Sequence, residues 1–576
     1  MSSRALIARV VPDVTGLDKH FDYLVPEAMR AAVRVGSIVR VPLGPRRVRG
    51  WVVHLEERAS VEGLKPVAAV VGLGPAPELV ELAAWASHRW CGPLRAVLNS
   101  ASPSTVVPAA VRRPSTQRSH VDETGRQHIP PSGVHRLPPC SDPVDLVLAA
   151  AAAGPLLVCC PSTAEAARLA ARLRRTGLRT ALMPREWAVA AGGVDVVIGS
   201  RGAVWAPCPS LAGVLVLDEH DETLQEERSP TWHARDVAIE RAARAGAQCW
   251  LVSPAPSLEA LQWGSGTMHR PSRDEERAGW PFVQIVDLDA QDLPVPTLVT
   301  RELLELSRAV DGAVVAVLNT KGRARRLVCK ACSHRIRCAG CGAAASLGSD
   351  GFVQCARCSQ QRPGVCDSCG STRLAPVGLG ISRLRDDLAS ATQRQVVEVA
   401  ASTADEVVSG ASDRALFIGT EAVLHRVRRA GVVVFLDFDD ELLAPRFRAA
   451  EEAMALIVHA ARLVGPRGAG GRIVVQTRVP GHEVLLAALH ADPSRLVADE
   501  LARRESLRMP PAWSIAQVRG DGAGAWLDSV LVGDVSGGGE TGWLVRERTP
   551  ELLADTLAAL GPRPSGVRVG VDPHRI

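Results

Sequence analysis

The stretch VLVLDEHDE, residues 214–222, decides the fold that this sequence predicts. Its apolar half predicts a buried strand of a parallel sheet, with Asp218 and Glu219 at the strand's tip. In ATP-driven motors, carboxylates at this place hold Mg²⁺ and polarise the attacking water. Such a site also requires a lysine on a glycine-rich loop further upstream.

The surrounding sequence predicts an α/β fold with two parallel-sheet lobes. Strand-like and helix-like runs alternate from residue 143 to about 270 and again from about 310, which is the βαβ pattern of a parallel sheet. Short β-like runs dominate the N-terminal part. The expected domains are a β-rich domain at 1–105, a linker at 106–142, lobe 1 at 143–305, lobe 2 at 306–483 and a small α/β domain at 484–576.

Composition indicates a soluble, cytoplasmic chain that does not contact membranes. The N-terminus lacks the apolar core of a signal peptide. The longest apolar run, 146–160, is interrupted by Gly154-Pro155 and is shorter than the roughly 20 residues that span a bilayer. The formal charge of +5 is too small to indicate a nucleic-acid partner by itself.

Eight cysteines in four C-x2-C pairs fall within residues 329–369. Two such pairs supply the four thiolates of one tetrahedral zinc, so we expect two structural Zn²⁺ ions per chain in an insertion at 329–370. Two pairings are open. A nested pairing joins the outer and the inner pairs, whereas a sequential pairing joins the first four and the last four cysteines.

These features resemble the primosomal protein N′ (PriA) family of replication-restart helicases. Segments similar to the family occur in the right order, among them HFDYLVPEAM, DVVIGSRGAVWAP, LVLDEHDE and CDSCGSTRLAPVGLG. The resemblance implies two RecA-like lobes and the nested zinc pairing. That pairing places Cys329, Cys332, Cys366 and Cys369 on zinc 1 and Cys338, Cys341, Cys355 and Cys358 on zinc 2.

The resemblance also implies a pocket for the 3′ end of a DNA strand in the N-terminal domain. Its residues here are Phe21, Asp22, Gly44 and Lys65. Phe21 can stack on a terminal base, and Asp22 can accept a hydrogen bond from a free 3′-hydroxyl. Gly44 permits close backbone approach, and Lys65 can pair with phosphate.

The chain departs from the family at its ATPase elements. The stretch PVDLVLAAAAAGPLLVCCPS, residues 143–162, stands where the family has a phosphate loop, but it contains no lysine and no glycine run. The family's arginine-finger positions fall on Leu463 and Pro466, with Arg462 and Arg467 one place away. Asp218 and Glu219 are therefore expected to be a vestigial nucleotide and Mg²⁺ site with a structural role, capping a helix or pairing with His233 and Arg235.

The expected function is that of a nucleoid-associated replication-restart protein with no catalytic residues and no helicase activity of its own. It would recognise forked and single-stranded DNA and help to reload the replicative helicase. Expected partners are primosome and helicase-loading proteins and the single-stranded DNA-binding protein. Two alternatives remain open: an ATP-dependent 3′→5′ helicase with an atypical nucleotide site, and a zinc-stapled interaction hub with no DNA role.

Overall fold

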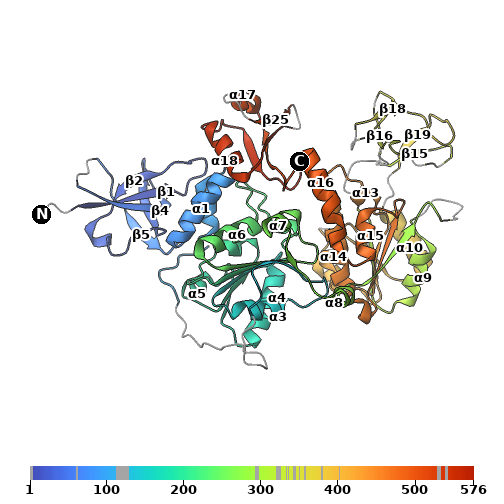
Figure 1. Ribbon diagram of the computed structural model, residues 1–576, viewed down its shortest axis with the longest axis horizontal. Helices are drawn as coiled ribbons and strands as arrows, with labels where there is room; N and C mark the ends of the chain where they lie inside the picture. Colours follow the sequence, from blue (N-terminus) through green and yellow to red (C-terminus); the bar gives the residue numbers. More distant parts are fainter. Residues whose placement is uncertain are drawn as a thin grey trace.

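The computed structural model of the chain has a β-rich N-terminal domain, two parallel-sheet lobes, a cysteine-rich insertion in the second lobe and a C-terminal domain (Figure 1). The predicted α/β class is confirmed. Among the described helices, none combines the length and the apolar character that a membrane span requires. The structure describes residues 4–59, 63–111, 129–291, 298–319, 326–332, 334, 336–340, 345–348, 350–355, 359–377, 381–400, 402–528, 533–538 and 542–576.

The N-terminal domain is an antiparallel sheet in the order β2-β1-β4-β3-β5. Alternate residues of its strands, such as Val39, Val41 and Val52, point into one buried core, as the period of a half-buried strand requires. Its elements are β1 (Ala5–Pro12), β2 (Phe21–Leu24), η1 (Glu27–Met29), β3 (Ile38–Leu43), β4 (Arg46–Arg58), β5 (Ala69–Gly72), α1 (Pro77–Arg89) and α2 (Leu94–Ser100).

Lobe 1 is a parallel sheet in the order β12-β6-β11-β10-β7-β9-β8. All residues of β7, β9 and β10 are buried, because helices cover both faces. The strands are β6 (Gly133–Arg136), β7 (Leu156–Cys159), β8 (Thr180–Leu182), β9 (Val196–Gly199), β10 (Gly213–Leu217), β11 (Gln248–Ser253) and β12 (Met268–His269). The helices are α3 (Val144–Ala151), α4 (Thr163–Arg175), α5 (Trp187–Ala191), η2 (Arg201–Trp205), η3 (Glu222–Leu224), α6 (Ala234–Ala245), α7 (Leu258–Trp263) and α8 (Arg273–Ala278).

Lobe 2 is a parallel sheet in the order β13-β23-β22-β14-β21-β20. Its strands are β13 (Phe282–Asp287), β14 (Val314–Val317), β20 (Val396–Val399), β21 (Leu416–Gly419), β22 (Val432–Phe435) and β23 (Arg472–Thr477). Its helices are α9 (Arg301–Ala309), α10 (Ile381–Thr392), α11 (Asp405–Ser409), α12 (Ala422–Arg426), α13 (Asp439–Leu442), α14 (Ala449–Val464) and η4 (Arg467–Ala469).

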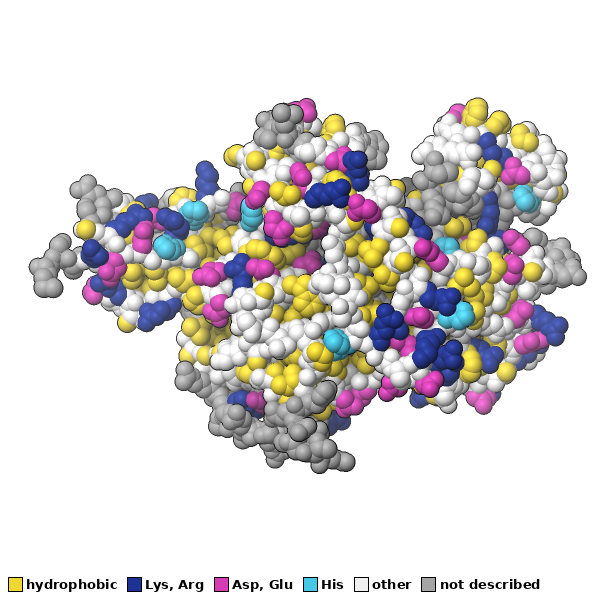
Figure 2. All heavy atoms as spheres, viewed as in Figure 1, with side chains coloured by type: hydrophobic (Ala, Val, Ile, Leu, Met, Phe, Trp, Pro, Cys, Tyr) yellow, Lys and Arg dark blue, Asp and Glu magenta, His cyan; other side chains and the backbone are white. Residues whose placement is uncertain are grey.

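The cysteine-rich insertion stands apart from lobe 2, at the upper right of Figures 1 and 2. The ion pair between Arg337 Nη2 and Asp439 Oδ2, 2.6 Å apart, ties it to α13. Its strands form two small antiparallel sheets. They are β15 (Arg326–Cys329) with β19 (Leu374–Val377), and β16 (Ala345–Leu347), β17 (Phe352–Cys355) and β18 (Gln361–Pro363) in that order.

The C-terminal domain packs on both the N-terminal domain and lobe 1. One continuous apolar core contains Trp90 of the N-terminal domain, Trp205 of lobe 1 and Leu557 of the C-terminal domain. The strands, in the order β25-β26-β24-β27, are β24 (Ser514–Arg519), β25 (Asp534–Gly537), β26 (Trp543–Glu547) and β27 (Arg568–Val571). The helices after residue 482 are α15 (Glu483–Leu489) and η5 (Pro493–Leu496), which pack on lobe 2, and α16 (Val497–Leu507), α17 (Ala523–Leu527) and α18 (Pro550–Ala559).

The structure differs from the predicted boundaries at three places. β6 lies in the predicted linker but pairs with β11 of lobe 1. β13 lies in predicted lobe 1 but pairs with β23 of lobe 2, and α15 packs in the core of lobe 2. The sequence pattern can indicate that a segment forms a strand, but it does not show which strand it pairs with, because the tertiary fold decides that. β6 has only four residues beside prolines, and the partner of β13 lies far along the chain, so periodicity could not assign either.

Candidate functional site

A cavity of about 450 Å³ lies between the lobes, at the carboxyl ends of the lobe 1 strands. Ligands of open parallel sheets bind at this edge, so this cavity is where a nucleotide would sit in a motor. Lobe 2 contributes the end of α14 to its wall. The lining includes Pro138, Pro139, Cys140, Pro161, Glu165, Asp218, Arg462 and Pro466.

The loop before the first helix of lobe 1 is residues 137–143, LPPCSDP, because α3 begins at Val144. Sequence reasoning placed the corresponding stretch at 143–162, so the structure moves it upstream. The conclusion about phosphate is strengthened, since three of the seven residues are prolines without an N–H.

The remaining N–H groups of this loop are largely used within the protein. Leu137 N donates to Ser253 O over 3.1 Å, Cys140 N donates to Gly279 O over 3.1 Å, and Ser141 N donates to Pro138 O over 3.0 Å. A phosphate site needs several free N–H groups that converge on one point. This loop cannot provide that arrangement without breaking its own hydrogen bonds.

Asp218 faces a guanidinium group of the other lobe. Arg462 on α14 forms a two-pronged ion pair with it, in which Nη1 donates to Oδ2 over 2.7 Å and Nη2 donates to Oδ1. Arg462 Nε also donates to Pro139 O over 3.2 Å. Burial disfavours the charged form of Arg462, but the adjacent Asp218 carboxylate outweighs it, and the pKa of Arg462 is raised. The side chain that could ligate Mg²⁺ is therefore already neutralised by the protein itself.

Glu219 is fully buried, and its carboxylate is held by neighbouring side-chain and backbone groups of lobe 1. It accepts hydrogen bonds from Ser257 N and Ser257 Oγ, both at 2.7 Å, just before α7, and Arg235 Nη1 lies 3.5 Å away. Burial raises the pKa of Glu219, and the charge of Arg235 opposes that rise. The expected contact with Arg235 is therefore present, whereas His233 caps α6 by accepting from Arg235 N.

The two arginines near the family's finger positions point to different places. Arg462 reaches into the cleft but binds Asp218. The guanidinium of Arg467 lies 5.0 Å from the ring centre of Phe282, and its backbone N donates to Trp280 O. The guanidinium of Arg462 is therefore not free to stabilise a transferring phosphoryl group, which is the role of an arginine finger.

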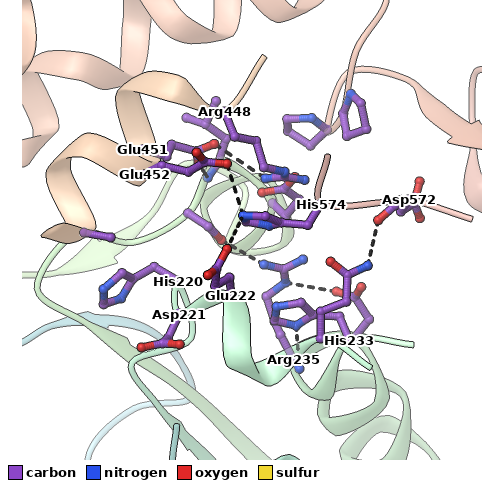
Figure 3. Close-up of a pocket in the computed structure, with 18 of the residues that line it drawn as sticks. His220, Asp221, Glu222, His233, Arg235, Arg448, Glu451, Glu452, Asp572 and His574 are labelled. Atoms are coloured by element: carbon purple, nitrogen blue, oxygen red, sulfur yellow. Dashed lines mark hydrogen bonds and ion pairs between the residues drawn. The ribbon is translucent and has the colours of Figure 1, made fainter. Parts of the chain in front are cut away.

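A larger cavity, about 840 Å³, lies where the two lobes and the C-terminal domain meet. Figure 3 shows His574 between Glu222 of lobe 1 and Glu452 of lobe 2, and its Nε2 lies 3.2 and 3.3 Å from their carboxylate oxygens. Burial lowers the pKa of His574, but the two carboxylates outweigh that effect and raise it. His459 of α14 lies 3.4 Å from Asp221 of lobe 1. Charged pairs therefore join the lobes here as well.

Four thiols of the cysteine-rich insertion converge on one point, and they could hold a metal ion. The sulfur atoms of Cys329, Cys332, Cys366 and Cys369 all lie within 4.8 Å of one another. The Sγ atoms of Cys329 and Cys369, and those of Cys332 and Cys366, are 3.6 Å apart. This set is the outer set of the nested pairing. The sequential pairing would have separated these cysteines.

The inner cysteine set is described in part. Cys338 and Cys355 are buried together beside Leu443 of lobe 2, and Cys338 Sγ lies 3.3 Å from Gln360 Oε1. These two cysteines are a candidate for part of a second metal site. Cys341 and Cys358 lie outside the described residues.

The predicted DNA-end residues lie around β2. Phe21 and Asp22 begin this strand, and Leu24 N donates to Lys65 O over 3.0 Å, so Lys65 lies beside it. Gly44 lies at the β3–β4 turn with φ +58°, and open space surrounds the position of a Cβ atom there. The Tyr23 hydroxyl joins β2 to the same hairpin by donating to Pro42 O over 3.1 Å.

Two arginines at this place were not found from the sequence. Arg9 Nε donates to Asp22 Oδ1 over 3.0 Å, and Arg58 Nη2 donates to Asp22 Oδ2 over 3.2 Å. The hydrogen bond from Arg9 is the main cause that lowers the pKa of Asp22. Asp22 is thus held as a carboxylate, able to accept a further hydrogen bond. Asp22 lies directly opposite Arg9 on the neighbouring strand, a register that the sequence alone did not show.

The ion pair between Asp218 and Arg462 should show strong energetic coupling. We expect a double-mutant cycle with Asp218→Ala and Arg462→Ala to give a coupling energy of about 1–3 kcal/mol, because each single change leaves a partly buried charge without its partner. Urea unfolding measures it. The matched control is the exposed pair Arg301 and Glu305 on α9, for which we expect at most about 0.5 kcal/mol. Equal coupling in the two cycles would contradict the role assigned to Arg462.

Comparison with known proteins shows which proteins this chain is similar to. Residues 9–103 match the family model of the PriA 3′DNA-binding domain. The replication restart protein PriA of Treponema pallidum is 29% identical over 55% of this chain and 50% of its own length. The probable PriA of Mycobacterium tuberculosis is 33% identical over 58% of this chain and 53% of its own.

Solved structures add little to this comparison. Dbp5 of S. cerevisiae bound to RNA and ADP BeF3 is 14% identical with a TM-score of 0.36, covering 65% of this chain and 85% of that chain. A similarity of this size is too weak to assign a function.

The chain spans about half the length of the curated relatives it matches. The match at residues 9–103 covers the predicted DNA-end residues Phe21, Asp22, Gly44 and Lys65. The resemblance drawn from the sequence is confirmed: the chain is similar to the replication restart proteins PriA, and its residues 9–103 match the model of their 3′DNA-binding domain.

Proposed function

We propose that this protein binds forked and single-stranded DNA at an exposed 3′ end and helps to reload the replicative helicase, without driving strand separation itself. Its relatives are named replication restart proteins, and its N-terminal domain matches their 3′DNA-binding domain. The protein would act in the cytoplasm at the nucleoid. Its partners would be primosome and helicase-loading proteins and the single-stranded DNA-binding protein.

One observation supports the proposed lack of motor activity. Arg462 forms a two-pronged ion pair with Asp218, the carboxylate that would hold Mg²⁺. A motor must release this carboxylate to a metal ion and bring a cation to the triphosphate. In this protein the nearby cation, Arg462, is already paired with Asp218. The proline-rich loop at 137–143 offers no phosphate cradle in its place.

The DNA end would be recognised by the groups around β2. Asp22, held ionised by Arg9 and Arg58, would accept a hydrogen bond from the terminal 3′-hydroxyl. Phe21 is half-buried and anchored in the domain core, which leaves part of its ring for stacking on a base. The exposed Lys65 would pair with a phosphate.

The cysteine-rich insertion would be a structural zinc platform. Four sulfurs about 2.3 Å from one tetrahedral zinc lie about 3.8 Å from one another, and the observed 3.6 Å separations fit that geometry. The N–H of Ala331 donates to Cys329 Sγ over 3.4 Å, a contact that supports a thiolate. With Cys338, Cys341, Cys355 and Cys358 as the second set, the chain would hold two Zn²⁺ ions.

Hydrolysis of ATP should be absent. We expect turnover on forked DNA far below about 1 s⁻¹, the lower end of the usual range for enzymes, and no change in Asp218→Asn. A radiolabelled-ATP assay on the purified protein measures it. Turnover at or above that rate, abolished by Asp218→Asn, would instead establish the alternative of an ATP-dependent 3′→5′ helicase with an atypical site.

Blocking the 3′-hydroxyl of the DNA should weaken binding. Fluorescence anisotropy with a fork that carries either a free 3′-hydroxyl or a 3′-phosphate should show about tenfold tighter binding of the free end, the value of one good hydrogen bond to a charged group. Asp22→Asn should remove most of this preference, while Asp13→Asn, which changes the ion pair with Arg95, should keep it. Equal binding of both ends by the unchanged protein would favour an interaction hub without a DNA-end role.

Metal analysis tests the zinc platform. We expect two zinc ions per chain, one of which is lost in Cys366→Ser, because three thiolates cannot close the tetrahedral site. Cys249→Ser is the control, since Cys249 is buried in β11 of lobe 1. Retention of both ions in Cys366→Ser, or a chain that binds no zinc, would contradict the assignment.

A further inference from the structure

Three arginines share one face of the β3–β4 hairpin. In this antiparallel pair Arg40 lies opposite Arg49, and Pro42 lies opposite Arg47. Residues directly opposite each other, and residues two apart on one strand, project from the same side of a sheet. Arg40, Arg47 and Arg49 therefore form one arginine face. Arg40 and Arg47 are exposed and Arg49 is half-buried.

This arginine face lacks counter-charges. Among the described residues, no ion pair involves any of its three members, whereas Arg9, Arg58 and Arg95 of the same domain each pair with an aspartate. Like charges placed opposite each other on a sheet repel and oppose folding. A cluster that the fold leaves uncompensated is suited to an anion from outside the domain.

The arginine face is held in place from beneath. The guanidinium carbon of Arg49 lies 5.5 Å from the ring centre of Trp51, which is fully buried and donates from Nε1 to Ser102 Oγ over 2.7 Å. Arg49 is half-buried, so part of its side chain stays accessible. A guanidinium that is held in one place and partly exposed can meet an acceptor-rich group such as phosphate.

The position of the hairpin indicates which phosphates of a DNA strand the arginine face would meet. Its turn carries Gly44, and the Tyr23 hydroxyl bonds it to β2, the strand of Phe21 and Asp22. We propose that the arginine face binds the backbone phosphates of the single strand that leads to the 3′ terminus. The assignment rests on the proposed DNA-end function and extends it from the terminal nucleotide to those before it.

The dimensions favour one strand rather than a duplex. Arg47 and Arg49 are two residues apart, which is roughly 7 Å along a β-strand. Arg40 adds one strand spacing of about 5 Å across the sheet. A surface of this size meets neighbouring phosphates of one strand and is too small to reach both backbones across the major groove of a duplex, which is about 12 Å wide.

The test compares Arg40→Gln/Arg47→Gln with a matched control, Arg563→Gln/Arg568→Gln, which removes the same charge from exposed positions of the C-terminal domain. Binding of a labelled single strand to the full chain is measured by anisotropy over a range of salt concentrations. Each strand carries either a free 3′-hydroxyl or a 3′-phosphate. A labelled blunt duplex is measured in parallel.

We expect the hairpin variant to bind the single strand about tenfold more weakly at moderate salt. The slope of log affinity against log salt should shrink by about 1.4, which is about 0.7 for each of the two phosphates that the removed arginines would neutralise. The preference for a free 3′-hydroxyl should stay, because Asp22 is untouched. The control variant should match the unchanged protein in affinity and in slope.

Unchanged affinity and slope in the hairpin variant would overturn the assignment, and so would a weakening confined to the duplex. A variant that keeps its affinity but no longer prefers a free 3′-hydroxyl would also overturn it, since the arginines would then act on the terminus itself. Failure of the proposed DNA-end function has a different signature. In that case the unchanged protein would bind free and blocked ends equally, while the salt slopes would still report on the arginine face.

Discussion

The two lobes are organised around an ion pair, Asp218 with Arg462, which crosses the cleft between them. Each charge in this partly enclosed cleft has given up part of its hydration, and removal of either partner would leave the other without compensation. In a working motor the same carboxylate must exchange partners in every cycle, because a metal ion and its nucleotide come and go. A guanidinium that belongs to the chain does not leave. Under the proposed function, this ion pair within the chain takes the place of a transient metal ion and would hold the two lobes in one arrangement.

Other contacts across the junction have the same character. His459 meets Asp221, His574 bridges Glu222 and Glu452, and Arg448 pairs with Glu259, so polar and charged side chains of lobe 2 and the C-terminal domain face carboxylates of lobe 1. Buried pairs of this kind are costly to open singly, because removal of one partner strands the other. The cleft is therefore lined by contacts of the chain with itself, and the functions proposed for the protein lie in the N-terminal domain and the cysteine-rich insertion.

Much of this architecture could be predicted from the sequence, but the cleft could not. Runs such as GVLVL predicted their strands because full burial requires continuous apolar residues, and the C-x2-C spacing indicated convergent thiols because each turn presents two of them. Arg462 was one position away from a family arginine, and nothing in the local pattern showed that its guanidinium reaches Asp218, 244 residues earlier. β6 and β13 were misassigned for a related reason: their pairing partners are chosen by the tertiary fold. Likewise, the cross-strand partners of Asp22 became visible only in the strand register.

The continuous core that joins Trp90, Trp205 and Leu557 has a thermodynamic consequence. Domains that share one apolar interior cannot expose it separately, so their melting is coupled, whereas lobe 2 has interior clusters of its own. The N-terminal domain, lobe 1 and the C-terminal domain should thus absorb heat as one cooperative unit. Among the residues that the structure describes, lobe 2 shares no part of that core and is joined to this unit through the ion pairs of the cleft.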